Sequence, residues 1–352
     1  MIYNQTSLPS IFHVEPGALE HVGDILDAHG LSTNRTLVLA GQSQSRRIAE
    51  EVAGQFKSAV VEIVADYSEA EAARLSAVLN AARSTLIVAI GGGGVIDVAK
   101  RVSKLYGTPC LVIPSVVSND GLMSPISVVK TNGDRFQSLP AAMPIGVIAD
   151  LDILMSAPRQ YLRASGGDLL SNLSATSDWR HVVDKGEGPL MNDIAYHLSR
   201  NSAEALVHWE SCDLGDVSFV RNLIIAQIYS GIAMSIAGTS RPCSGPEHLI
   251  SHALDELNLT PGVLHGVQVG SACLFSLHLL GELTPEVLRF ADAMQIPHVW
   301  TDLLPDAADA KAVLAHARRV RPERRTILDS FTDDQLVAEL AHLQERCVSL
   351  SS

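Results

Sequence analysis

The stretch that decides the fold is Thr85-Leu86-Ile87-Val88-Ala89-Ile90-Gly91-Gly92-Gly93-Gly94-Val95-Ile96-Asp97-Val98-Ala99-Lys100. Its apolar run predicts a strand over 85–90, and a helical pattern follows from about 95 to 105. Glycines at such a junction allow close backbone approach, and the positive end of the helix favours a phosphate. The segment therefore predicts a dinucleotide-binding loop, although a structural turn is the alternative and the spacing is not Gly-x-Gly-x-x-Gly. The predicted loop residues are Gly91, Gly92, Gly93, Gly94 and Asp97.

The same alternation of strands and helices extends through the first half of the chain. Further apolar strands are predicted at 36–40, 59–64, 110–115 and 145–150, and helices at 46–54 and 69–82. Strands that are apolar throughout and separated by helices indicate a parallel sheet covered on both faces. Residues 126–136 interrupt this pattern and predict a hairpin that turns at Asn132-Gly133.

From about Ala157 onward the pattern is helical. We therefore predict an α/β N-terminal Rossmann-like parallel-sheet domain plus an all-α C-terminal domain. The boundary falls near residue 155, which gives a dinucleotide-binding domain over 1–155 and a helical domain for metal and substrate over 156–352.

Composition limits the function classes. The 352 residues are 47% hydrophobic and 18% charged, which is an ordinary globular composition. No apolar run reaches the roughly 18 residues that span a bilayer, and the first residues lack a signal-peptide pattern, so we expect a soluble, cytoplasmic protein without membrane insertion. The formal net charge of -13 disfavours nucleic acid and anionic membranes as partners. Five scattered cysteines without a Cys-x-x-Cys pair argue against disulfides and a thiolate zinc site.

Three histidines and one aspartate form a candidate metal site. His248 and His252 are four residues apart on a predicted helix, so they share one face. His265 precedes the next apolar helix, and Asp168 starts another one. A carboxylate among apolar neighbours is costly without a cation or hydrogen bonds, and one carboxylate with two imidazoles leaves coordination positions open, as a catalytic zinc or iron site requires. The alternative is a set of ordinary core and surface histidines.

The strand over 36–40 is followed by Gly41-Gln42-Ser43-Gln44-Ser45. An acidic residue at such a strand end commonly holds the adenosine ribose and excludes a 2′-phosphate. None is present here, so NADP is permitted and NAD is not excluded.

Five segments together are specific for one superfamily. They are Gly91 to Lys100, Pro114-Ser115-Val116-Val117-Ser118-Asn119-Asp120-Gly121, Gly167-Asp168, Ser240-Arg241-Pro242-Cys243-Ser244-Gly245-Pro246-Glu247-His248 and Leu264-His265-Gly266. Over roughly residues 10–290 the chain resembles the glycerol-1-phosphate dehydrogenases. Their superfamily also contains iron-type alcohol dehydrogenases, glycerol dehydrogenases and dehydroquinate synthases.

The resemblance implies a dehydroquinate synthase-like fold and assigns roles to single residues. Asp168, His248 and His265 match metal-binding positions, and His252 matches a histidine beside the metal that relays a proton. Asp120 matches an aspartate near the substrate and the nicotinamide. The segment that lines the cofactor includes Ser115 and Ser118.

The implied reaction is reduction of dihydroxyacetone phosphate to sn-glycerol 1-phosphate with NAD(P)H and one divalent metal, for which zinc, iron and nickel all tolerate these ligands. Gly94 and Asn119 depart from the Lys and His that many members carry there, so a polyol-type dehydrogenase stays the main alternative, followed by a dehydroquinate synthase-like cyclase. The expected partners are a small phosphorylated triose or polyol and further copies of the chain. Arg163 and Arg241 are candidate phosphate partners, whereas the basic run over 318–325 reads as solvated.

Overall fold

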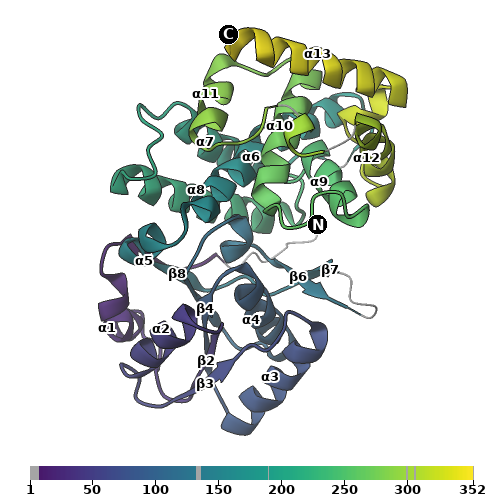
Figure 1. Ribbon diagram of the computed structural model, residues 1–352. Coiled ribbons are helices and arrows are strands. Elements are labelled where there is room, and N and C mark those ends of the chain that lie inside the picture. Colours follow the sequence, from purple (N-terminus) through teal and green to yellow (C-terminus); the bar gives the residue numbers. More distant parts are fainter. Residues whose placement is uncertain (1–7, 132–135, 189, 299, 305–306, 352) are drawn as a thin grey trace. The chain divides into compact units, whose positions relative to one another are not determined.

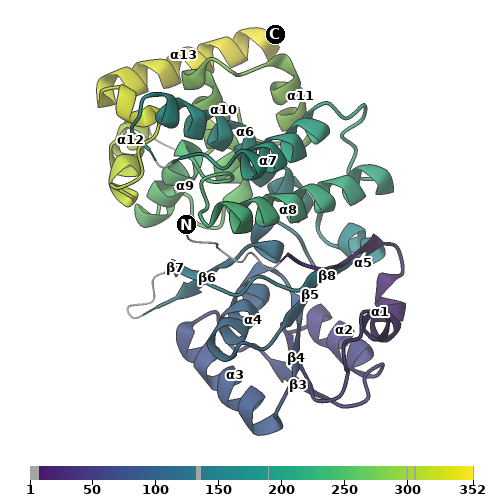
Figure 2. The ribbon, with the colours of Figure 1, turned by 180° about the vertical axis from the view of Figure 1, so that it is seen from behind.

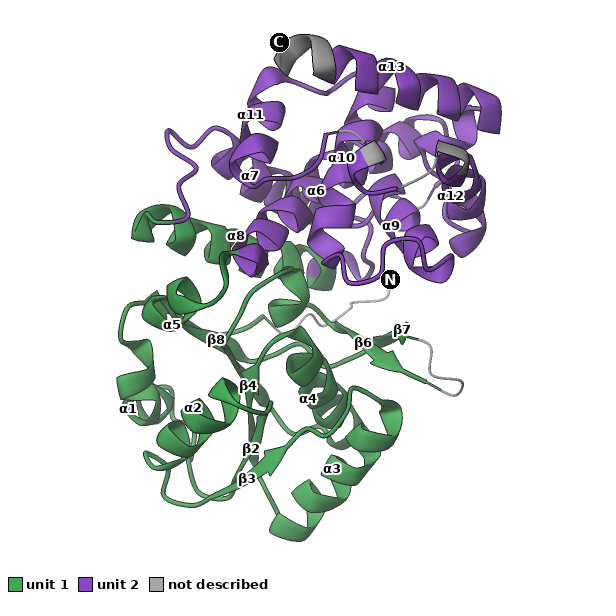
Figure 3. Cartoon of the chain, viewed as in Figure 1, with its two compact units in different colours: residues 1–159, 215–235 green, residues 160–214, 236–352 purple. Residues whose placement is uncertain are grey.

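We describe the protein from a computed structural model that covers residues 8–131, 136–188, 190–298, 300–304 and 307–351 (Figures 1 and 2). The chain forms two compact units (Figure 3). Unit 1 contains residues 1–159 and 215–235, and unit 2 contains residues 160–214 and 236–352. The two units are described separately below.

Unit 1 is built on a six-stranded sheet in which every pair of neighbours is parallel. Its strand order is β1-β8-β5-β4-β2-β3. The strands are β1 (Ile11–Glu15), β2 (Thr36–Ala40), β3 (Ala59–Ile63), β4 (Leu86–Gly91), β5 (Cys110–Pro114) and β8 (Gly146–Asp150). In the register, Ala40 lies beside Ile90 and Gly91 beside Pro114. The loops that leave β2, β4 and β5 therefore start side by side, at the carboxyl-terminal ends of the strands.

Helices cover both faces of this sheet, so its four central strands, which are mostly apolar, are buried at every position. The helices α1 (Val22–Ala28) and α2 (Gln44–Ala53) lie on one side, and α3 (Glu69–Ala82) and α4 (Gly93–Tyr106) lie on the other (Figure 1). Along β2, Val38 packs into the first core and Leu37 into the second, as the two-residue period of a strand requires. This arrangement confirms the predicted fold class for the first half of the chain.

Most predicted elements of unit 1 are present with small shifts at their ends. The predicted helix over 69–82 coincides with α3, and the predicted hairpin is the antiparallel pair β6 (Ile126–Lys130) and β7 (Phe136–Pro140). Its predicted turn at Asn132-Gly133 lies outside the described residues. The first strand, β1, was not predicted. It pairs with β8, far along the chain, and carries polar residues at His13 and Glu15.

Unit 2 is helical. Its main helices are α6 (Arg159–Asp184), α7 (Asp193–Val207), α9 (Pro246–Glu256), α10 (His265–Leu280), α11 (Pro285–Ala293), α12 (Ala307–Val320) and α13 (Asp333–Ser351). One core joins α9, α10, α12 and α13, with Phe275 packed edge-on against Trp300. The short helix η4 (Ile327–Ser330) closes the segment that follows α12.

The prediction placed all of 156–352 in the helical half of the chain. The helix α8 (Val217–Ala237) lies within that range but belongs mostly to unit 1. Residues 215–235 belong to unit 1 because α8 packs closely there. A Cβ added at Gly231 would lie 2.6 Å from the backbone of Met123, so no larger residue fits without a shift. By length and composition α8 is also the one described helix that could cross a membrane, but 61% of its most apolar window is buried, as in a core helix.

The prediction that Asp168 starts a helix is wrong, since α6 begins at Arg159 and continues past it. Two glycines, Gly166 and Gly167, precede Asp168 within the helix. They let α6 pass close to α10: a Cβ added at Gly167 would overlap the carbonyl group of Gly266, and one added at Gly270 would lie 2.9 Å from the Gly167 Cα. These glycines therefore serve helix packing.

Candidate metal centre and cofactor loop

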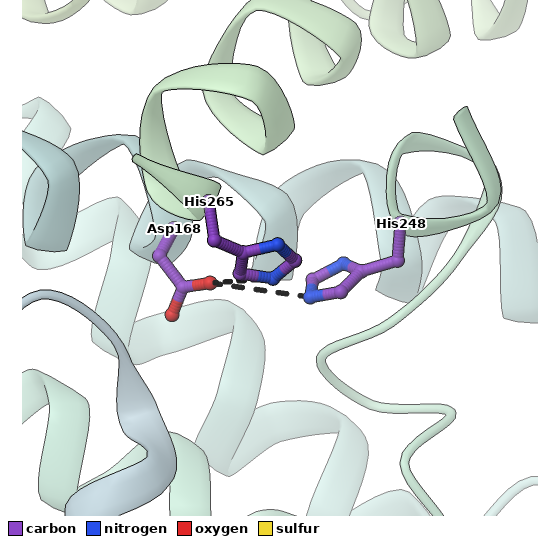
Figure 4. Close-up of side chains that lie close together, drawn as sticks. All are labelled: Asp168, His248 and His265. Carbon is purple, nitrogen blue, oxygen red and sulfur yellow. Dashed lines mark ion pairs between the residues drawn. The ribbon is translucent and has the colours of Figure 1, made fainter. Parts of the chain in front are cut away.

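Asp168, His248 and His265 come together in unit 2 (Figure 4). The Asp168 Oδ1 atom lies 3.9 Å from His248 Nε2 and 3.9 Å from His265 Nε2. Each residue offers one ligand atom, and these atoms lie within 4.8 Å of one another. A separation of 3.9 Å is too long for a hydrogen bond, but it suits donor atoms that share an ion.

The close passage of α6 and α10 brings two of these residues together. Asp168 follows Gly167 on α6, and His265 precedes Gly266 at the start of α10. A Cβ added at Gly266 would lie 2.6 Å from the Ala164 carbonyl carbon and closer still to its oxygen. Because the backbones touch at this point, side chains one residue away face the same space.

Each imidazole is oriented by a partner on its other nitrogen. His248 Nδ1 lies 3.0 Å from Glu247 Oε1, and His265 Nδ1 lies 3.1 Å from Ser251 Oγ. Glu247 is fully buried and also accepts from Ser174 Oγ at 2.7 Å and from the Gly245 amide at 2.5 Å. Such outer partners fix the tautomer and direction of metal-ligating histidines. The donor set therefore fits a divalent metal.

His252 lies on the same face of α9 as His248, as the spacing predicted. Its ring centroid is 6.1 Å from that of His265, and the two rings are stacked with an interplanar angle of 28°. Burial, followed by His248, Arg321 and Arg324, lowers the pKa of His252 to about 3. Burial and the neighbouring rings also hold the pKa of His265 well below 6.5. Both imidazoles are therefore neutral at pH 7, the form in which histidine binds metals.

The predicted cofactor loop lies where β4 meets α4. Gly91 ends the strand, Gly92 is the N-cap, and α4 starts at Gly93. A Cβ added at Gly93 would meet no atom within 4 Å, so the backbone is open to a ligand there. The first amides of a helix have no intrahelical acceptor and attract anions. At Gly94, where many related chains carry Lys, the Tyr67 ring lies 2.8 Å from an added Cβ.

Two predicted residues after β5 lie next to this loop. The Ser115 amide donates to the Gly91 carbonyl at 3.0 Å, and Ser115 Oγ is 3.1 Å from Ser45 Oγ in the loop after β2. Ser118 follows in the same segment and is half-buried. Asp120 opens the short helix η2 (Asp120–Met123) and accepts a hydrogen bond from Ser230 Oγ at 2.7 Å.

Asp97 has a different neighbourhood from the one the sequence suggested. Its carboxylate pairs with the fully buried Lys100, whose Nζ is 2.9 Å from Asp97 Oδ1. Lys100 also donates to the carbonyl oxygens of Gly121 at 2.6 Å and Ile126 at 2.5 Å. Burial raises the pKa of Asp97, and Lys100 opposes that rise. The pair thus holds the segment around Asp120, and a role of Asp97 in cofactor binding stays a prediction.

Sequence reasoning missed the basic groups beside the histidines. Arg241, a predicted phosphate partner, is buried and pairs with Asp178 at 2.9 Å. In the run that was read as solvated, Arg321 and Arg324 are only partly exposed. Arg324 donates to the Ser244 carbonyl at 2.6 Å, to Ser244 Oγ at 3.1 Å and to Ser240 Oγ at 2.9 Å. The Arg-Pro-Glu-Arg spacing alone carries no signal of this burial.

A second cluster of possible metal donors lies between α10 and α13. It consists of His278, Glu339 and His342, which the sequence gave no role. His278 Nε2 is 2.9 Å from Glu339 Oε2, an ordinary hydrogen-bond distance. His342 has a largely exposed side chain.

Comparison with known proteins defines the class first. Residues 13–158 match the family model described as iron-containing alcohol dehydrogenase. The fold agrees: a probable glycerol dehydrogenase from Sinorhizobium meliloti 1021 superposes with a TM-score of 0.78 at 22% identity, covering 96% of this chain and 98% of that one. The glycerol dehydrogenase from Schizosaccharomyces pombe gives 0.75 at 18% identity, covering 96% and 89%.

Curated relatives then identify the branch. The glycerol-1-phosphate dehydrogenase [NAD(P)+] of Pyrococcus furiosus is 36% identical over 84% of this chain and 83% of its own length. That of Hyperthermus butylicus is 34% identical over 92% and 93%. The chain belongs to the glycerol-1-phosphate dehydrogenase family, which confirms the predicted resemblance. For this family an NAD(P) cofactor and a divalent metal are expected.

Proposed function

We propose that the protein is a metal-dependent, NAD(P)-linked dehydrogenase that interconverts dihydroxyacetone phosphate and sn-glycerol 1-phosphate. The observation that carries this proposal is the convergence of Asp168, His248 and His265 on one point in a chain of this family. Residues 1–155 would form the dinucleotide-binding part and residues 156–352 the metal- and substrate-binding part, except that 215–235 pack within unit 1.

Asp168, His248 and His265 would hold the metal, for which we propose zinc, since one carboxylate and two imidazoles leave a coordination position open. When bound, the metal polarises a carbonyl group as a Lewis acid and NAD(P)H supplies the hydride. Glu247 and Ser251 keep the two imidazoles turned toward Asp168. These contacts prepare the site before any ligand arrives.

His252 is the proton relay in this proposal. Its neutral ring passes a proton by accepting at one nitrogen while the other nitrogen releases one. Reduction of a ketone needs one proton at the product oxygen, and the reverse reaction returns it. The stacking of His252 on His265 keeps the relay beside the proposed ligands.

The amides at the start of α4, around Gly93 and Gly94, would bind the pyrophosphate of the dinucleotide. Ser115 and Ser118 would line the same pocket of unit 1, and Asp120 would stand near the nicotinamide and substrate. No acidic residue follows β2, so both NAD and NADP are accepted in the proposal. We further propose a cytoplasmic homo-oligomer, which size-exclusion chromatography tests.

The test is an absorbance assay of NAD(P)H oxidation with defined metals added. We expect turnover of dihydroxyacetone phosphate and little of unphosphorylated dihydroxyacetone. His265→Ala removes the metal and the turnover but keeps dinucleotide binding, measured by fluorescence. His316→Ala is the matched control, since His316 makes a 2.6 Å contact with Glu256 and lies outside the ligand set. Full activity of metal-stripped His265→Ala, or no reduction of dihydroxyacetone phosphate with any metal, overturns the proposal.

A further inference from the structure

Among the described residues, no acidic side chain pairs with the guanidinium groups of Arg321 and Arg324, which lie in the segment after α12. The Arg324 guanidinium donates hydrogen bonds to neutral oxygens, those of Ser240 and Ser244. The Arg321 carbonyl oxygen accepts a hydrogen bond from the Arg324 amide at 2.9 Å, but for the Arg321 side chain no hydrogen bond or ion pair is found within the described part of the chain, although the residue is only partly exposed. Arg241 nearby shows the contrast, because its charge is matched by Asp178.

Partial burial makes these two charges costly. Burial lowers the pKa of Arg321, and burial followed by Arg321 and Arg241 lowers the pKa of Arg324 to about 10. The acidic groups that oppose this effect are Glu323, which is exposed, and Glu247, whose carboxylate is already bonded within the site. Partly desolvated cations that repel one another are stabilised when an anion binds between them.

The pair lies next to the proposed catalytic groups. Arg324 is bonded to Ser244, one helical turn before His248, in the turn that leads into α9. The helix α12 packs along α9, and Arg321 directly follows its last residue, Val320. The charges of both arginines are felt at the His252 ring. A small substrate bound at Asp168, His248 and His265 would therefore have the two arginine side chains beside it within unit 2.

We propose that Arg321 and Arg324 bind the phosphate group of the substrate, so that the segment between α12 and η4 selects phosphorylated over unphosphorylated trioses. This inference rests on the proposed function and deepens it. Arginine suits the task because its planar fork donates two parallel hydrogen bonds to phosphate oxygens. Arg324 is held in place by the two serines, and the Arg321 guanidinium, which has no hydrogen-bond partner among the described residues, can close on the ligand.

The test compares Arg321→Gln with Arg321→Lys and with Arg319→Gln. Arg319 is exposed in the same basic run, so its substitution makes the same change of charge away from the site. For Arg321→Gln we expect kcat/KM for dihydroxyacetone phosphate to fall at least roughly 30-fold, mainly through KM, as for the loss of one partner of a desolvated charge pair. Arg321→Lys recovers part of this loss. Turnover of unphosphorylated dihydroxyacetone stays within about twofold of the unmodified protein, since that substrate does not use the arginine.

A binding measurement separates this inference from the proposed function. Calorimetric titration with inorganic phosphate should show binding to the unmodified protein and to Arg319→Gln, and a loss in Arg321→Gln. If the protein reduces neither triose but this pattern holds, the proposed function fails and the anion site stands. If the protein reduces dihydroxyacetone phosphate and Arg321→Gln does so equally well, the inference is overturned and the proposed function stands. Arg163→Gln is a further comparison, since the Arg163 Nε atom is buried without a partner among the described residues. If phosphate binding is lost in Arg163→Gln but kept in Arg321→Gln, the inference is also overturned.

Discussion

The passage of α6 against α10 leads to the sharpest prediction, which concerns Gly266→Ala. The added methyl group would lie 2.6 Å from the Ala164 carbonyl carbon and 3.0 Å from the Ala164 Cα. Carbon atoms in good contact are roughly 3.5 Å or more apart, so the helices must separate locally by about 1 Å. Overpacking of this kind costs about 1–3 kcal/mol of unfolding free energy.

The same shift moves the side chain of the neighbouring residue, His265, away from Asp168, now 3.9 Å apart at their donor atoms. Metal–ligand distances tolerate only about 0.2 Å, so we expect the zinc affinity of Gly266→Ala to fall at least roughly 100-fold. Zinc affinity is measured by competition with a chromophoric chelator, and unfolding by thermal denaturation of the metal-free protein.

Gly270→Ala is the graded control on the same helix. Its methyl group would lie 2.9 Å from the Gly167 Cα and 3.1 Å from Ile296 Cγ2, which is less severe, and it is one turn further from the ligands. We expect a smaller loss of stability and little change in zinc affinity. If Gly266→Ala binds zinc and unfolds like the unmodified protein, the account of how the two helices build the centre is wrong.

Three further predictions concern other buried groups. Lys100→Met leaves Asp97 without its cation and should cost about 3–5 kcal/mol in chemical denaturation; an unchanged midpoint would contradict the structural role given to this pair. Glu247→Gln removes the charge behind His248 and should weaken zinc binding roughly 10- to 100-fold in the same chelator competition, whereas equal affinity would remove it from the site. Burial lowers the pKa of His181 below 6.5, so folding loses stability as pH falls below 6.5, because the unfolded chain takes up the proton more readily. His181→Gln should therefore show a smaller drop in melting temperature between pH 7.5 and pH 5.5, and an identical drop would refute the assignment.

Local patterns in the sequence predicted those helices and strands that are determined by residues close together in the chain. The run from 85 to 105 combines an apolar strand, glycines and an amphipathic helix, and the observed β4 and α4 differ from it by only a residue or two at the ends. The same holds for α3, which Ser68 caps through a hydrogen bond to the Glu71 amide. The proposed metal ligands were found because they lie in short motifs, and the structure brings their donor atoms together.

Features that depend on distant contacts could not be predicted in this way. Strand β1 has only five residues, of which His13 and Glu15 are polar, and its identity comes from pairing with β8. The prediction of a helix start at Asp168 was wrong, and nothing local to Gly166 and Gly167 reveals the helix that crosses there. Arg321 and Arg324 lie in a stretch as charged as any exposed loop, and only the packing of that stretch desolvates them.

The placement of α8 has a consequence for protein engineering. Because residues 215–235 complete unit 1, the chain passes between the two units at three points, near residues 159, 214 and 235. A recombinant chimera that exchanges only residues 1–159 with a relative would combine a foreign Met123 loop with a resident Gly231. A chimera that transfers cofactor preference from a relative should therefore exchange two fragments together, residues 1–159 and residues 215–235, so that α8 and the sheet come from the same parent.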